Sequence, residues 1–123
     1  MGRLTLSNGD EDKKIIAFTI NKQVKEKLKA VLVRSKDYNL KKKSDWVNEA
    51  ILMLKENPDY SSIVFSAGGN TEDFILDKIY MNFEQRCCFS EMRSDVVRQY
   101  PDIRGPQGAI IRAAILSRIM HKM

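Results

Sequence analysis

Two stretches of this chain alternate apolar and polar residues over the length of a strand, and they constrain its fold most strongly. The first is KIIAFTIN, Lys14–Asn21, and the second is DKIYMNF, Asp77–Phe83. Alternation places successive side chains on opposite faces of a strand. A lone strand with one wet face cannot satisfy its own backbone hydrogen-bonding groups. We therefore expect the two stretches to pair with each other.

Each stretch is followed by two segments with the apolar periodicity of amphipathic helices. Residues 22–37 and 45–57 follow the first stretch, and residues 85–100 and 109–123 follow the second. The last segments of the two halves align with Trp46 on Ile110 and Ile51 on Ile115. The strands align one residue differently, with Ile16 on Ile79 and Ile20 on Phe83. The chain therefore reads as an internal repeat.

This order predicts an α+β fold of tandem units, β-α-α, linker, β-α-α. Because neither unit can bury its apolar faces alone, we expect a two-stranded antiparallel ribbon on four helices, an intramolecular pseudo-dimer. The expected divisions are a flexible N-terminal tail at 1–12, a first unit at 13–57, a linker at 58–73 and a second unit at 74–123. Residues 13–123 would form one compact domain.

Composition narrows the classes of function. The net charge of +5 and a pI of about 9.3 favour an acidic partner. No apolar run reaches the length of a membrane span and no signal-peptide pattern opens the chain, so we expect a cytoplasmic protein with no membrane partner.

Residues suited to catalysis or metal binding are few in the sequence. Cys87 and Cys88 are adjacent, which suits neither a structural disulfide nor a zinc site, and His121 is the only histidine. No paired carboxylates or glycine-rich phosphate loop can be recognised. We expect no enzyme activity, no metal and no cofactor.

The first half resembles the ribbon-helix-helix family of DNA-binding proteins. The resemblance lies in the strand, the helix NKQVKEKLKAV, a polar turn and KKSDWVNEAI, in which Ser44, Asp45, Trp46 and Glu49 match the family's second helix. PQGAIIRAAIL takes the same place in the second half. The tandem plan resembles single-chain members of the family that assist T-DNA transfer or plasmid conjugation.

The resemblance implies a site as well as a fold. A two-stranded ribbon fits the DNA major groove, where each base pair shows a distinct pattern of donors and acceptors. The ribbon residues expected to contact bases are Ile15, Ala17, Thr19, Lys78, Tyr80 and Asn82. Phosphates are expected at the starts of the two second helices. The residues expected there are Lys42, Lys43, Ser44, Arg104, Gly105, Gln107 and Gly108.

The function implied is double-stranded DNA binding by a bacterial monomer, accessory to T-DNA or conjugative plasmid transfer, alongside other DNA-processing or transfer proteins. A transcriptional repressor and an antitoxin-like protein-interaction module are the alternatives. An exposed sheet face with no ligand also stays open for the six ribbon positions, although Ile15 beside Tyr80 is unusual on a surface that meets only water.

Overall fold

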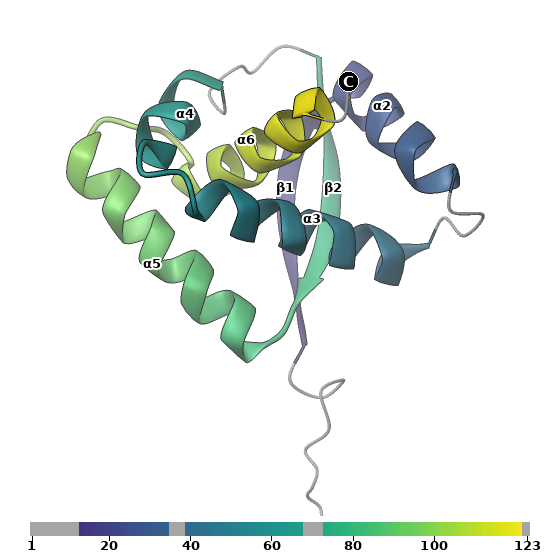
Figure 1. Ribbon diagram of the computed structural model, residues 1–123, viewed down its shortest axis with the longest axis horizontal. Coiled ribbons are helices and arrows are strands. Elements are labelled where there is room, and N and C mark those ends of the chain that lie inside the picture. Colours follow the sequence, from purple (N-terminus) through teal and green to yellow (C-terminus); the bar gives the residue numbers. More distant parts are fainter. Residues whose placement is uncertain (1–12, 35–38, 68–72, 122–123) are drawn as a thin grey trace, which may run out of the picture.

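The computed structural model describes residues 13–34, 39–67 and 73–121, so the expected tail at 1–12 lies outside the described residues (Figure 1). Two strands and five helices follow one another in this part of the chain. In order they are β1 (Lys14–Asn21), α2 (Lys22–Val33), α3 (Leu40–Lys55), α4 (Tyr60–Ala67), β2 (Phe74–Met81), α5 (Phe83–Gln99) and α6 (Pro106–His121).

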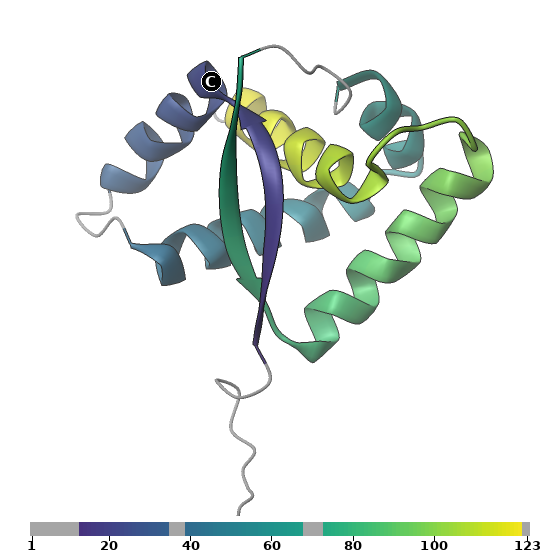
Figure 2. The ribbon, with the colours of Figure 1, turned by 180° about the vertical axis from the view of Figure 1, so that it is seen from behind.

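The two strands form an antiparallel ribbon, as the alternating stretches predict. Ile16 lies opposite Ile79 and Phe18 lies opposite Asp77. The inner face of the ribbon is covered by helices, and Phe18, Ile20, Ile79 and Met81 are buried there. Figure 2 shows the ribbon from the other side, with the strands in front and helices behind or beside them. One face of the ribbon is therefore left uncovered.

Helices α3 and α6 form the layer beneath the ribbon. They pack against each other, and α3 contacts β2 whereas α6 contacts β1. The buried side chains of α6 fall on most sides of the helix because it also contacts α2, α4 and α5. A helix with apolar residues on most sides is expected at the centre of a core. These residues are Ala109, Ile110, Ile111, Ala113, Ala114, Ile115 and Ile119.

The prediction of a four-helix tandem fold is wrong, because the expected linker contains a fifth helix. Helix α4 packs against α5 and α6, and it buries Tyr60, Ser61 and Val64. Tyr60 and Val64 stand one helical turn apart, which places them on the same side of the helix. The Pro, Ser and Gly around them favoured a linker. The observed order is β-α-α-α-β-α-α, so three helices follow the first strand and two follow the second.

Tyr60 ties α4 to α5 through its hydroxyl, which donates a hydrogen bond to the carboxylate of Asp95. Asp95 also accepts from Arg98 at 2.9 Å. The Tyr60 hydrogen bond lowers the pKa of Asp95. Burial, together with the neighbouring carboxylate, raises the pKa of Tyr60. The pair stabilises the fold while Asp95 is ionised and Tyr60 is protonated.

The predicted boundaries of the second strand are also wrong. Strand β2 ends at Met81, and Asn82 caps α5 by accepting from the Gln85 N–H at 2.8 Å, while its own N–H donates to Gln85 Oε1 at 2.9 Å. Phe83, expected on the inner ribbon face, is the first residue of α5 and is exposed. Asn21 caps α2 in a similar way. Each strand therefore leads into an asparagine cap, so Asn21 corresponds to Asn82, and the predicted alignment of Ile20 with Phe83 is wrong.

Candidate nucleic-acid interface

The uncovered side of the ribbon is formed by six side chains, which we call the outer ribbon face. Strand pairing places Ile15 opposite Tyr80, Ala17 opposite Lys78 and Thr19 opposite Leu76. Residues opposite each other in an antiparallel pair point to the same face. Five of the six residues expected to contact bases are therefore brought together: Ile15, Ala17, Thr19, Lys78 and Tyr80.

The outer ribbon face is unusually apolar for a surface open to water. Leu76 is 72% exposed and Ile15 is 52% exposed, and Ala17 and Lys78 are also exposed. Thr19 and Tyr80 are half-buried. Exposed large apolar side chains that gather on one surface mark interaction sites. The arrangement combines methyl-bearing groups, a hydroxyl, a phenol and one cation.

Asn82 does not lie on this face, so its expected place on the ribbon is wrong. It is half-buried, and its Oδ1 is used as the cap of α5. Leu76 takes the third outward position of β2 in its stead. Sequence reasoning missed Leu76 because the strand was expected to begin at Asp77. The apolar run at Phe74, Ile75 and Leu76 was the available signal.

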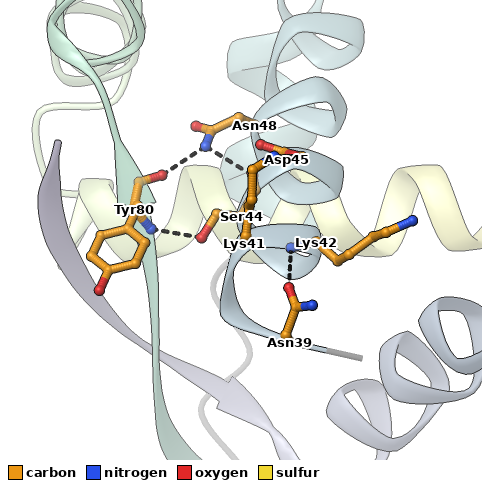
Figure 3. Close-up of polar contacts among 7 residues, drawn as sticks. All are labelled: Asn39, Lys41, Lys42, Ser44, Asp45, Asn48 and Tyr80. Atoms are coloured by element: carbon orange, nitrogen blue, oxygen red, sulfur yellow. Dashed lines mark hydrogen bonds and ion pairs between the residues drawn. The ribbon is translucent and has the colours of Figure 1, made fainter. Parts of the chain in front are cut away.

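Helix α3 holds the backbone of β2 at Tyr80. The Tyr80 N–H donates to Ser44 Oγ at 2.8 Å, and Asn48 Nδ2 donates to the Tyr80 carbonyl at 2.8 Å (Figure 3). Asn48 Nδ2 also donates to the Ser44 carbonyl at 2.8 Å. The Tyr80 ring points away from α3 in Figure 3. Ser44, expected to contact phosphate, is buried and serves the outer edge of the ribbon instead.

Lys43, also expected to contact phosphate, is turned inward. Its Nζ lies 2.5 Å from Asp77 Oδ1 beneath the ribbon, and the side chains of Lys43 and Asp77 are only 10% and 3% exposed. Lys25 Nζ lies 3.7 Å from the second oxygen of Asp77. Two lysines from α2 and α3 thus meet one buried carboxylate of β2. A buried charge is tolerated only with such partners.

The start of α3 differs from the start expected at Asp45. The helix begins at Leu40, and Asn39 Oδ1 caps it by accepting from the Lys42 N–H at 2.8 Å. Lys41 and Lys42 are exposed, and Lys41 Nζ lies 3.1 Å from Asp45 Oδ2. In Figure 3 the Lys42 side chain extends away from Tyr80. Of the three residues expected to contact phosphate here, only Lys42 is on the surface.

The start of α6 agrees more closely with expectation, since Pro106 is its first residue. Gly105 has a φ of +53°, a left-handed conformation that favours glycine, and its carbonyl accepts from the Ala109 N–H at 3.0 Å. Arg104, Gly105 and Gln107 are exposed, and Gly108 is half-buried. The exposed residues at this end can reach an anion outside the protein.

Arg112 of α6 contacts β1 at Thr19. Its Nη1 donates to Thr19 Oγ1 at 3.0 Å and to the Thr19 carbonyl at 3.1 Å. Its guanidinium carbon lies 4.9 Å from the centre of the Phe74 ring. A Cβ at Gly108 would lie 2.8 Å from Arg112 Nη1. Burial lowers the pKa of Arg112. Sequence reasoning did not single out this residue.

An open groove of about 580 Å³ lies beside Tyr80, between α3 and the start of α5. Its lining includes Lys13, Lys41, Asn82 and Gln85. Amide and ammonium groups of this kind can donate to an anion. Asn82 faces this groove next to the ribbon, so whether it reaches DNA stays a prediction.

Comparison of the chain with protein-family models, curated proteins and solved structures found no match. Within residues 13–34, 39–67 and 73–121, no helix combines the length and apolarity needed to cross a membrane. In the same residues no cluster of three or more His, Cys, Asp or Glu side chains is placed to bind a metal ion.

Proposed function

We propose that this protein binds double-stranded DNA by inserting the outer ribbon face into the major groove. The observation that carries the proposal is a two-stranded ribbon with helices packed on one face, seen from its uncovered face in Figure 2, and with Ile15, Leu76 and Lys78 exposed on that uncovered face. The major groove is about 12 Å wide and admits a two-stranded ribbon. Burial against DNA would remove the exposed apolar groups from water.

The chemistry of the outer ribbon face suits base edges. Lys78 can donate to the O6 and N7 acceptors of guanine, and Ile15, Ala17 and Leu76 can contact thymine methyl groups. Thr19 and Tyr80 add hydroxyl groups beside them. The two strands present different residues, so the preferred site is expected to be non-palindromic. Lys42, Arg104 and the exposed start of α6 are the proposed phosphate contacts.

The resemblance of the first half to ribbon-helix-helix proteins supports a non-enzymatic role, without cofactor, in T-DNA or conjugative plasmid transfer in the bacterial cytoplasm. Transcriptional repression would use the same surface. We propose that a monomer suffices, because both strands of the ribbon come from one chain.

A protein-interaction module of the antitoxin type is the second candidate. The exposure of Leu76 favours it, because an apolar side chain that is 72% exposed also fits a protein interface. Salt dependence separates the two candidates. In a complex dominated by phosphate contacts, the logarithm of the binding constant falls linearly and steeply with the logarithm of the salt concentration.

The test is binding to a library of random duplexes, followed by titration of the selected duplex at several salt concentrations. Lys78→Ala is expected to cost about 1–3 kcal/mol of binding free energy on the selected duplex, the scale of one good base contact. Arg93→Ala, which removes a cation from the exposed face of α5, is the control for charge.

Two leucines provide a matched control for the apolar contact. Leu76→Ser is expected to weaken binding, whereas Leu52→Ser, at a residue of α3 that is 50% exposed, should leave it unchanged. Binding that is insensitive to salt, or equal effects of the two leucine substitutions, would count against DNA in the major groove.

A further inference from the structure

We propose that Arg112 is a positioning residue for base reading, which holds the Thr19 side chain in one rotamer so that its hydroxyl meets the major groove in a fixed orientation. This inference rests on the proposed function. It assigns a role to a side chain that does not itself lie on the outer ribbon face. It also predicts that base preference at the position opposite Thr19 depends on Arg112.

Arg112 and Thr19 lie 93 positions apart in the chain. The side chain of Arg112 contacts both the side chain and the backbone of Thr19. Arg112 Nη1 donates to Thr19 Oγ1 at 3.0 Å and to the Thr19 carbonyl at 3.1 Å. Two hydrogen bonds from one nitrogen to the same residue restrain both the strand and the χ1 rotamer of Thr19. The strand edge and the side chain are thus held together.

The direction of the Thr19 hydroxyl follows from the chemistry of arginine. A guanidinium donates hydrogen bonds and never accepts them, so one lone pair of Thr19 Oγ1 is occupied by Arg112. The hydroxyl hydrogen must then point away from the cation. The hydroxyl hydrogen and the second lone pair stay available to a base edge, where purine N7, guanine O6 and thymine O4 are acceptors and the amino groups of adenine and cytosine are donors. A fixed rotamer therefore presents the Thr19 hydroxyl to one base position in one orientation.

Two further groups keep Arg112 in place. Its guanidinium lies over the Phe74 ring at 4.9 Å, a cation–π contact that restrains the plane of the group. Gly108, one helical turn earlier, leaves the room that Nη1 occupies, because a Cβ there would lie at 2.8 Å. The glycine expected to bind phosphate thus has a packing reason to be glycine.

The other strand is held differently. Ser44 and Asn48 bind the backbone of Tyr80 and not its phenol. On β1, by contrast, Arg112 holds both the backbone of the strand and a side chain of the outer ribbon face. The base opposite Thr19 should therefore be read more selectively than its hydroxyl alone would allow.

The experiment measures base preference with Arg112→Met, Thr19→Val and the double variant. Arg112→Met is expected to relax preference at one base position by about three- to ten-fold, the range for one neutral hydrogen bond. Thr19→Val should relax the same position, and the double variant should lose no more than either single variant. Arg93→Met removes a charge elsewhere and should leave the preference at that position unchanged.

Gly108→Ala displaces the guanidinium while keeping its charge, so it separates positioning from electrostatics. It should relax the same base position without lowering the unfolding temperature, because alanine favours a helix over glycine. Arg112→Lys keeps the charge but not the double contact, and it should not restore the preference. In the protein without DNA, NMR three-bond couplings across χ1 of Thr19 should report one rotamer in the wild type. The same couplings should report averaging over rotamers in Arg112→Met and Gly108→Ala.

The outcomes are separable. Wild-type protein with no salt-dependent affinity for any duplex overturns the proposed function and this role of Arg112 with it. A wild type that binds, with base preference intact in Arg112→Met and Gly108→Ala, overturns only the role of Arg112. If Arg112→Met lowers the affinity for all duplex sequences equally, Arg112 is a phosphate contact, and this result also overturns the proposal. If Arg112→Met does not fold, Gly108→Ala decides.

Discussion

Replacing Lys43 by methionine should destabilise the fold far more than the same change two residues earlier. Lys43 and Asp77 form an ion pair whose side chains are 10% and 3% exposed, whereas Lys41 and Asp45 form one at 74% and 63%. Removing one partner of a buried pair leaves an uncompensated charge and costs about 3–5 kcal/mol. Removing one partner of an exposed pair costs about 0.2–1 kcal/mol.

The loss of unfolding free energy expected for Lys43→Met is at the lower end of the range for a buried pair. Asp77 would keep Lys25 at 3.7 Å and the hydrogen bond from the Lys78 N–H at 2.7 Å. We therefore expect about 3 kcal/mol less free energy of unfolding for Lys43→Met and under about 1 kcal/mol for Lys41→Met. Urea unfolding followed by circular dichroism measures both. Lys43→Met combined with Asp77→Leu should recover most of the loss, since no buried charge is then left on β2.

The same variants separate the sequence prediction for Lys43 from the structural one. A phosphate contact at Lys43 would flatten the salt dependence of DNA binding by about one unit when it is removed. The buried position predicts no such change for Lys43→Met, while Lys42→Met should flatten the slope. A loss of stability in Lys43→Met no larger than in Lys41→Met would refute the reasoning about burial.

Two other predictions concern pH and association. Because the hydrogen bond from Tyr60 lowers the pKa of Asp95 below its usual 3.8, its stabilisation is complete above that value and is lost as pH falls through the lowered pKa. Tyr60→Phe should therefore reduce the loss of stability in acid unfolding below about pH 4, and an unchanged acid transition would contradict this. Light scattering should find a monomer whose unfolding midpoint does not depend on protein concentration; an obligatory dimer would rule out a ribbon made by one chain.

Several features could be predicted from the sequence because they depend on near neighbours. Alternation of apolar and polar residues identified both strands, and their burial pattern on the inner face follows from the period of two. Pro106 at the start of α6 followed from its fixed φ. Five of the six residues on the outer ribbon face were identified in this way, since outward positions alternate with inward ones.

The boundaries and the fifth helix could not be obtained in the same way. Asn82 suits either the end of a strand or a helix cap, and the capping box with Gln85 decided for the cap. In α4, short helical length and surrounding turn residues hid the pair Tyr60 and Val64, which form a helix because α5 and α6 cover them. Short helices draw their stability from tertiary packing more than from propensity.

The sequence by itself determined that two half-buried strands would pair and that helices would cover one of their faces, because a wet strand cannot satisfy its backbone alone. Tertiary structure decided which charged and polar groups reach solvent. Lys43 turns inward because Asp77 is buried 34 positions away, and Thr19 is held by Arg112 93 positions away. Contacts over such separations depend on the packing of whole helices against the ribbon, which no local pattern encodes.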